Sequence, residues 1–170
     1  MTSLEDRIRR LEDRAAIQDL VADYFRATDD DDIAALAQCF TRDARFVATG
    51  FPGGHGREGI VDFLVAARAA MSQTVHTPNY VHIAFAADGD HADGTVMAHL
   101  EIGIGATTVF AAVRYLDSYA REEGCWRIAR REMRSVHLGP WADVARSLVD
   151  PLNVRWPGGE PGPSDFPRKP

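Results

Sequence analysis

Two glycine turns divide the second half of this chain into long segments that suit β-strands. The turns are Asp88-Gly89-Asp90 and Glu122-Glu123-Gly124, and both have the composition of hairpin connections. The segments around them predict four strands, at about residues 74–87, 91–105, 107–121 and 125–137. Strands joined by tight turns run antiparallel, so this half of the chain predicts an antiparallel meander.

The first part of the chain carries a helical pattern instead. Ser3 followed by Asp6 approximates a capping box, which marks the start of a helix. The apolar residues that follow recur near a helical period, at Leu4, Ile8, Leu11, Ala15, Leu20, Tyr24 and Phe25. The acidic run from Asp29 to Asp32 interrupts this repeat and predicts the end of the helix.

Three shorter elements are expected after the acidic run. They are a second helix through Ile33, Leu36, Ala37 and Phe40, a short strand at 44–49 and a third helix at 57–71. Helices grouped against one face of an antiparallel sheet make an α+β domain. Long strands that curl around helices leave a concave pocket, which is a common form of small-molecule site.

We expect one domain over residues 1–139 and a tail over residues 140–170. A chain of 170 residues is long enough to bury a sizeable core within one domain. Seven of the nine prolines lie after Gly139, which disfavours further strands there, although 141–149 could form a short helix. Trp156 and Phe166 are costly to leave in water, so the tail is expected to pack on the body or on a neighbouring subunit.

Charge and hydropathy argue against several classes of protein. The formal charge of -6 disfavours nucleic acid as a partner, and no segment approaches the roughly 18 apolar residues of a membrane span. The N-terminal residues lack the basic start and apolar core of a signal peptide. Cys39 and Cys125 show no metal-site spacing, so we expect two reduced thiols in a cytoplasmic protein.

Although the net charge of the chain is negative, one segment is rich in basic residues and forms a basic cluster: Arg121, Arg127, Arg130, Arg131 and Arg134. Most of its members lie along one expected strand, where successive side chains point to opposite faces. The cluster is therefore expected to divide between two faces and to form ordinary solvated or paired charges.

Two segments carry the residue types of acid–base chemistry. Tyr24 and Asp29 lie at the end of the long helix, and His76 lies at the start of a strand. An imidazole titrates near neutral pH and can accept a proton, while a carboxylate can orient it and a phenol can donate a hydrogen bond. This set is sufficient for proton abstraction without a metal or cofactor, provided that the fold brings the three side chains together.

Three stretches along the chain carry a family resemblance. They are Arg14-Ala15-Ala16-Ile17-Gln18-Asp19-Leu20 with Tyr24 and Asp29, then Phe40 with Asp43-Ala44, and finally Gly124-Cys125-Trp126-Arg127-Ile128. Together they resemble the SnoaL-like branch of the nuclear transport factor 2-like superfamily, over about residues 5–137. The resemblance implies a cone-shaped, curved antiparallel sheet packed against three N-terminal helices.

Within that superfamily, two segments are similar to the scytalone dehydratase, bile-acid dehydratase and hexachlorocyclohexane dehydrochlorinase group: Tyr24-Phe25-Arg26-Ala27-Thr28-Asp29 and His76-Thr77-Pro78. This likeness implies a dyad of Asp29 and His76, with Tyr24 donating toward the substrate. Arg131 falls near the position of a pocket arginine in the dehydrochlorinase. The dehydrochlorinase also has a lysine early in its chain, which has no basic counterpart here because Tyr24 lies in that part of the sequence. The family also implies a homo-oligomer, a trimer or a dimer, formed through the outer sheet face.

Other residues are weaker candidates for the site. Those proposed to bind substrate or shape the pocket are Arg131, Asn79, Tyr80, His99, Phe46, Phe63, Val113 and Met133. The histidines at 82, 91, 99 and 137 are too dispersed to predict a metal site. The glycine loop at 50–56 lacks the lysine and following hydroxyl of a phosphate-binding loop, so we expect neither a metal nor a cofactor.

The sequence therefore favours a cofactor-independent lyase of the dehydratase type, acting on a small, largely apolar molecule. A polyketide cyclase or an isomerase could use the same base. A non-catalytic ligand-binding protein is the alternative from a different class, because one fold hosts many functions.

Overall fold

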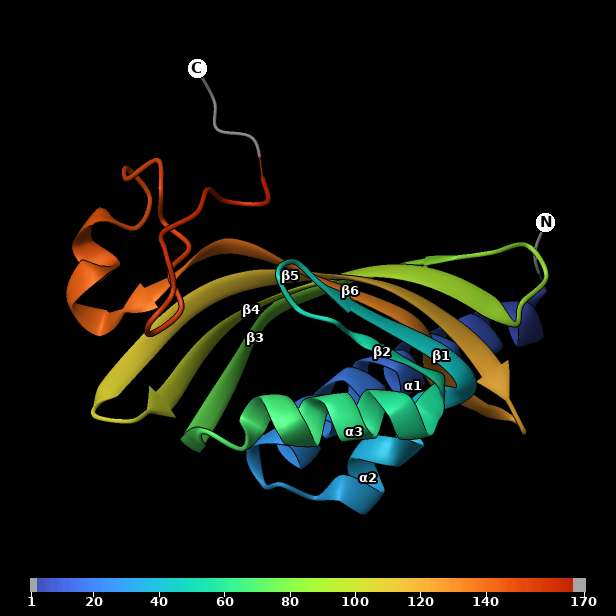
Figure 1. Cartoon of the computed structure of the whole chain (residues 1–170). Helices are drawn as coiled ribbons and strands as arrows, with labels where there is room; N and C mark the ends of the chain where they lie inside the picture. The colour runs from blue at the N-terminus through green and yellow to red at the C-terminus, as the bar shows by residue number, and fades with distance from the viewer. Residues whose placement is uncertain (1–2, 167–170) are drawn as a thin grey trace.

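A computed structural model describes residues 3–166 and places three N-terminal helices on the concave side of one curved sheet (Figure 1). The helices are α1 (Leu4–Asp29), α2 (Ile33–Gln38), α3 (Gly56–Arg68) and the 3₁₀ helix η1 (Trp141–Arg146). The strands are β1 (Phe40–Ala48), β2 (Gly54–His55), β3 (Met71–Phe85), β4 (His91–Ile104), β5 (Thr107–Glu122) and β6 (Cys125–Pro140). The predicted α+β class is confirmed.

The six strands follow the order β2-β1-β6-β5-β4-β3. The meander β3 to β6 is antiparallel throughout, as predicted, and its turns use Gly89 and Gly124 at φ values of 83° and 80°. These values lie in the left-handed region, which glycine enters without a steric penalty. Among these strands, the parallel pair is β1 with β6, which are not joined by a hairpin but are separated in the chain by β2, α3 and three further strands.

Helix α1 begins with the predicted capping box. The Ser3 hydroxyl accepts from the Asp6 amide at 3.0 Å, and the Asp6 carboxylate accepts from the Ser3 amide at 3.1 Å. The second half of the helix packs on the sheet and buries Ile17, Val21, Tyr24 and Phe25, among others. In the first half, Leu4, Ile8 and Leu11 are exposed, and the contact with the sheet is made by polar residues such as Asp13, which accepts from Arg121 and Trp126. The predicted helical repeat is therefore correct, but only its second half faces the core.

Two predicted helix ends were wrong by a few residues. Helix α2 ends at Gln38 and not at Phe40, because the Cys39 carbonyl already accepts the amide of Ile128 in the sheet. Helix α3 ends at Arg68 and not at Met71, which is the first residue of β3. In both places pairing with a neighbouring strand overrides the local helical pattern.

A buried ion pair lies at the centre of the core. The guanidinium of Arg131 donates twice to the Asp117 carboxylate, at 2.8 and 2.7 Å, and neither side chain is exposed. Tyr119 donates its hydroxyl to the same carboxylate at 2.7 Å. The guanidinium also lies 4.1 Å from the ring centre of Tyr24 and 4.6 Å from that of Tyr115. This cluster ties β5 and β6 to the buried face of α1.

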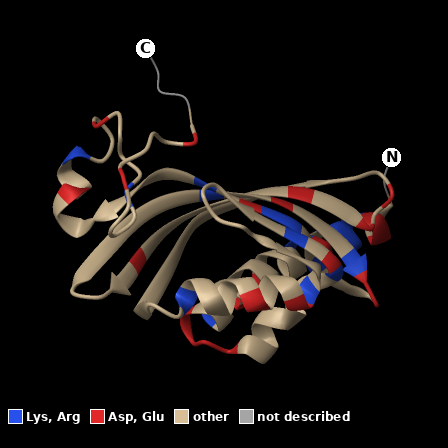
Figure 2. Ribbon diagram, viewed as in Figure 1, with Lys and Arg blue, Asp and Glu red and all other residues tan. Residues whose placement is uncertain are grey.

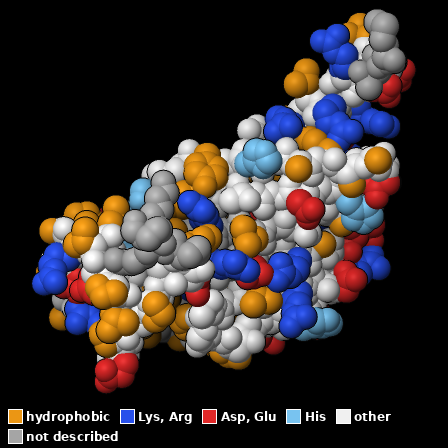
Figure 3. All heavy atoms as spheres, turned by 90° about the horizontal axis from the view of Figure 1, so that it is seen from above, with side chains coloured by type: hydrophobic (Ala, Val, Ile, Leu, Met, Phe, Trp, Pro, Cys, Tyr) orange, Lys and Arg blue, Asp and Glu red, His pale blue; other side chains and the backbone are white. Residues whose placement is uncertain are grey.

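The remaining arginines of the basic cluster are paired, as predicted. Arg130 and Arg134 flank Glu132 on β6 and both bind its carboxylate. Arg121 pairs with Asp13 and Asp90. Seen from above the sheet, basic and acidic side chains lie beside one another over the middle of that face (Figure 3).

The tail packs along the last part of β6, beyond the residues of β6 that pair with β1. Leu138 donates its amide to the Asn153 carbonyl at 2.9 Å, and the Arg155 amide returns a bond to the Leu138 carbonyl at 2.7 Å. The ring of Trp156 meets that of Phe51 edge-on, with centres 5.2 Å apart. The division into a domain and a tail at residue 139 stays a prediction, and residues 167–170 lie outside the described part. Among the described residues no helix is long and apolar enough to cross a membrane.

The buried ion pair generates a test of stability. Arg131→Met leaves the Asp117 carboxylate buried without its counter-charge, which is expected to lower the free energy of unfolding by about 3–5 kcal/mol. The matched control Arg131→Met/Asp117→Leu/Tyr119→Phe removes the charges and the hydroxyl together and should recover most of that loss. Urea unfolding of the three proteins measures both values. Equal stability of the single and triple variants would contradict the account.

Candidate active site

The fold brings two of the three acid–base residues into direct contact. Asp29 is the last residue of α1, and His76 lies on β3, the edge strand that α1 packs against. Nδ1 of His76 lies 2.6 Å from Oδ1 of Asp29. The imidazole side chain is 6% exposed and the carboxylate 23%. The contact is therefore short and largely withdrawn from water, which strengthens it electrostatically.

Two further donors fix the Asp29 carboxylate. The backbone amide of His76 donates to Oδ2 at 2.8 Å, and the hydroxyl of Thr74 donates to Oδ1 at 2.8 Å. Burial alone would raise the pKa of Asp29, but its hydrogen bonds to His76 and Thr74 together lower that pKa below its ordinary value. The group is therefore held as a carboxylate at neutral pH.

Arg68 orients the Thr74 hydroxyl. Its Nη1 lies 3.0 Å from the Thr74 oxygen, and its Nε and Nη2 donate to the Asp31 carboxylate. An arginine can only donate, so the Thr74 oxygen must accept from it and direct its own hydrogen to Asp29. The acidic turn between α1 and α2 lies below the end of α3, which brings these charges together (Figure 2).

The geometry also defines the state of the His76 ring. An ionised Asp29 can only accept a hydrogen bond, so Nδ1 carries a hydrogen in this contact. The ring stacks on Phe25, with centres 5.0 Å apart and planes 16° from parallel. The stacking and the carboxylate together prevent the ring from turning.

His76 lines an apolar cavity of about 400 Å³. Its walls come from α1, β1, α3, the four long strands and the tail, and the apolar members include Phe46, Phe63, Leu100, Ile102, Met133 and Trp156. Trp156 was not predicted to be part of the site, since nothing local in the sequence shows where the tail returns. A cavity of this size and polarity suits a small, largely apolar molecule.

Tyr24 lies in the same cavity wall, backed by the buried ion pair. Burial raises the pKa of the Tyr24 hydroxyl, and the neighbouring Arg131 guanidinium opposes this only in part. The phenol therefore stays protonated at neutral pH. In the same turn of α1, the Thr28 hydroxyl donates to the Tyr24 carbonyl at 2.7 Å.

The residues predicted to bind substrate divide into two groups. Phe46, Phe63 and Met133 line the cavity. The other five are not among the residues that line this cavity, and their binding roles stay predictions: Arg131, Val113, Asn79, Tyr80 and His99.

Each of these five has a physical reason for its position. Arg131 lies behind Tyr24 in its ion pair, and Val113 is buried in the core. The pairing of β3 with β4 shifts between Pro78 and Tyr80, so Asn79 lies at an irregularity, and both Asn79 and Tyr80 are exposed. His99 alternates with the cavity residue Leu100 and stacks instead on Phe110.

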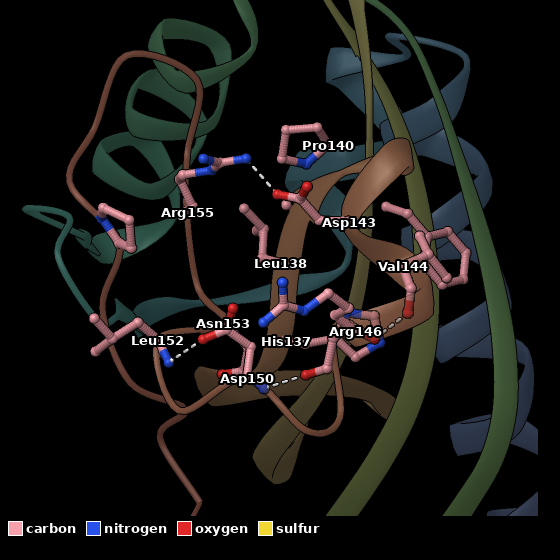
Figure 4. Close-up of a pocket in the computed structure, with 14 residues that line it drawn as sticks. His137, Leu138, Pro140, Asp143, Val144, Arg146, Asp150, Leu152, Asn153 and Arg155 are labelled. Carbon is pink, nitrogen blue, oxygen red and sulfur yellow. Dashed lines mark hydrogen bonds and ion pairs between the residues drawn. The ribbon is translucent and has the colours of Figure 1, made fainter.

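A second cavity, of about 310 Å³, lies between the end of β6 and the tail (Figure 4). Its lining includes the ion pair of Arg155 with Asp143, and it also includes His137. Burial and the nearby His99 lower the pKa of His137. Within residues 3–166 no carboxylate accepts a hydrogen bond from this ring, so the second cavity lacks the dyad of the first. In the same range no group of three potential metal ligands comes together.

Comparison with protein families places residues 9–132 in the SnoaL-like domain family. The chain belongs to this family. It is 28% identical over 137 residues to the γ-hexachlorocyclohexane dehydrochlorinase of Sphingobium indicum, covering 79% of this chain and 88% of that protein.

Solved structures agree with the family assignment. The dehydrochlorinase LinA superposes with a TM-score of 0.75 at 26% identity, over 81% of this chain and 95% of LinA. A putative scytalone dehydratase from Novosphingobium aromaticivorans shares the fold at 21% identity, with a TM-score of 0.72 over 78% of this chain and 90% of that one. The predicted nuclear transport factor 2-like fold is confirmed, and relatives that are lyases support an enzymatic function.

The Thr74 bond can be tested by substitution. Thr74→Val keeps the shape of the side chain and removes the donor, so the pKa of Asp29 is expected to rise. Thr74→Ser keeps the donor and should leave this pKa near the wild-type value. Carbon-13 NMR of the Asp29 carboxyl during an acid titration measures it. An unchanged titration in Thr74→Val would show that the hydroxyl does not stabilise the carboxylate.

The lowered pKa of Asp29 also predicts a pH dependence of stability. A carboxyl whose pKa is lower in the folded state stabilises the protein above its unfolded pKa, and that contribution is lost as the pH falls through the folded value. Asp29→Asn is therefore expected to be less stable than wild type at about pH 7. The difference should shrink as acid protonates Asp29 in the wild type. Denaturant unfolding at both ends of this range measures it, and a constant difference would contradict the assignment.

Proposed function

We propose that this protein is a cofactor-independent lyase that removes water from a small, largely apolar substrate. The observation that carries the proposal is the 2.6 Å contact between Asp29 and His76 in the wall of an apolar cavity. The relatives support an elimination: a dehydrochlorinase removes hydrogen chloride, and a dehydratase removes water. Both reactions require a base that takes a proton from carbon.

His76 is the proposed base. Its Nε2 accepts a proton from the carbon next to a carbonyl group, and the electron pair of the broken C–H bond forms a C=C bond as the neighbouring C–O bond breaks. The Asp29 carboxylate stabilises the imidazolium and does not itself take the proton. The imidazolium then returns the proton to the departing hydroxide, so that water leaves and the base is restored. A positioned base of this kind contributes about 10²–10⁴-fold to the rate.

Tyr24 is the proposed hydrogen-bond donor to the substrate. As the C–H bond breaks, negative charge builds on the carbonyl oxygen, and a neutral phenol stabilises it more than it stabilises the ground state. Because a phenol occupies the neighbourhood of the dehydrochlorinase lysine, we favour dehydration over dehydrochlorination for this chain.

A cyclase or an isomerase would begin with the same proton abstraction, whereas a binding protein would not. Exchange of substrate protons with heavy water separates these classes, because it reports proton abstraction whatever step follows. α-Tetralone is a suitable probe, since it is a small apolar ketone with exchangeable protons and no leaving group. 3-Hydroxy-1-tetralone adds the hydroxyl that a dehydratase would remove.

The catalytic test compares two histidines of β3. We expect the wild type to catalyse deuterium exchange into α-tetralone and loss of water from 3-hydroxy-1-tetralone, both followed by proton NMR. His76→Ala should slow both by at least about 100-fold, since it removes the base. His82→Ala changes an exposed histidine of the same strand and should have no effect. If wild type binds these ketones but exchanges no protons, the protein is a binding protein.

The homo-oligomer implied by the family resemblance remains a proposal as well. Val75 and Tyr80 on β3 are exposed large apolar side chains, 45% and 46% accessible, and would suit burial in a subunit contact.

A further inference from the structure

The first turns of α1 carry a row of exposed apolar residues. Residues 3–12 are all exposed, and within them Leu4, Ile8 and Leu11 are accessible to 70%, 48% and 67%. Exposed Ala15 continues the series, with spacings of four, three and four residues. This spacing places all four on one stripe of the helix. At the N-terminal end in Figure 1, α1 reaches the edge of the molecule.

The stripe faces away from the body. At about 100° per residue, Leu4, Ile8, Leu11 and Ala15 cluster on one side of the helix axis, and the buried residues Ile17, Val21 and Tyr24 cluster on nearly the opposite side. The protein's own core therefore cannot cover the stripe. A second helix laid on it would carry its own body on the far side, so the two bodies would not collide.

The sequence of the stripe is that of a short coiled-coil seam. In a heptad repeat written abcdefg, with Ile8 at position a, Leu4 and Leu11 fall at position d and Ala15 falls at the next position a. In parallel coiled coils, a β-branched residue at position a with leucine at position d favours an assembly of two helices. The flanking g and e positions hold Arg7 and Glu12, and neither side chain forms an ion pair within the described residues.

Charge selects the orientation of such a pair. In a parallel pair, position g of one helix meets position e of the following heptad on the other, so Arg7 faces Glu12 of the partner subunit, twice by symmetry. An antiparallel pair would instead place g against g and e against e, which opposes like charges.

We propose that this stripe, formed by Leu4, Ile8, Leu11 and Ala15, binds the same stripe of a second copy of the chain in a parallel, two-fold symmetric helix pair. The contact is distinct from the outer sheet face. It joins two bodies through their first helices.

Sedimentation measures the assembly directly. We expect the wild-type mass to be an even multiple of the chain mass and to fall by half in Ile8→Glu, which places a charge in the seam. Ala16→Glu adds the same charge at an exposed position outside the stripe and should keep the wild-type mass. A monomeric wild type, or a mass unchanged by Ile8→Glu in a protein with wild-type circular dichroism, would overturn the proposal.

A charge exchange tests the Arg7–Glu12 pairing. Arg7→Glu and Glu12→Arg each oppose like charges across the seam, and each is expected to weaken dimerisation by roughly 5-fold or more at low salt. The double variant restores opposite charges and should recover wild-type dimerisation. Failure of the double variant to recover would overturn the parallel register.

Cross-linking tests the orientation. Facing a positions lie together only in a parallel pair, so Ile8→Cys in a Cys125→Ser background is expected to form a disulfide-linked dimer under mild oxidation. Ala16→Cys in the same background should not. The absence of a cross-link at Ile8→Cys would exclude the parallel pair. None of these measurements depends on catalysis, so they stand apart from the proposed lyase activity.

Discussion

The carboxylate of Asp29 joins the end of α1 to the edge strand β3, and the geometry of the site depends on it. It accepts from the Thr74 hydroxyl and the His76 amide and meets the His76 ring. Three donors on one carboxylate hold it ionised and leave its oxygens few alternative partners. Because these bonds cross from a helix end to a strand, the same interactions that complete the fold also orient the proposed base.

A second layer lies beneath the first. Phe25 stacks on the His76 ring, and the Arg131 guanidinium lies 6.0 Å from the centre of the Phe25 ring. Asp117 neutralises that guanidinium within the core. Burying two charges is costly unless they are paired and hydrogen-bonded. Here the charges are paired, and Nε and Nη2 of Arg131 both donate to Asp117, whereas the buried Nη1 has no hydrogen-bond partner among the described residues. Arg131 thus lies behind Tyr24 and is not part of the cavity lining, which is mostly apolar.

Much of this arrangement could be predicted from short-range patterns. The turns at Gly89 and Gly124 defined the meander, and the spacing of Asp29 and His76 within a recognisable family predicted their contact. Thr74 could have been found, since it lies two residues before His76 and therefore on the same face of β3. Arg68 and Trp156 could not, because their positions depend on how α3 ends and how the tail returns. A register irregularity near Asn79 likewise has no local signal in the sequence.

The account rests on one proton. If Asp29 orients His76 as a base, the neutral ring carries its hydrogen on Nδ1, and Nε2 is free to accept. Nitrogen-15 NMR of labelled histidine distinguishes the two tautomers through the shifts of the ring nitrogens. The account predicts a protonated Nδ1 and an unprotonated Nε2 for His76 at neutral pH. A ring with its hydrogen on Nε2 would leave no lone pair facing the cavity and would contradict the proposed role of the dyad.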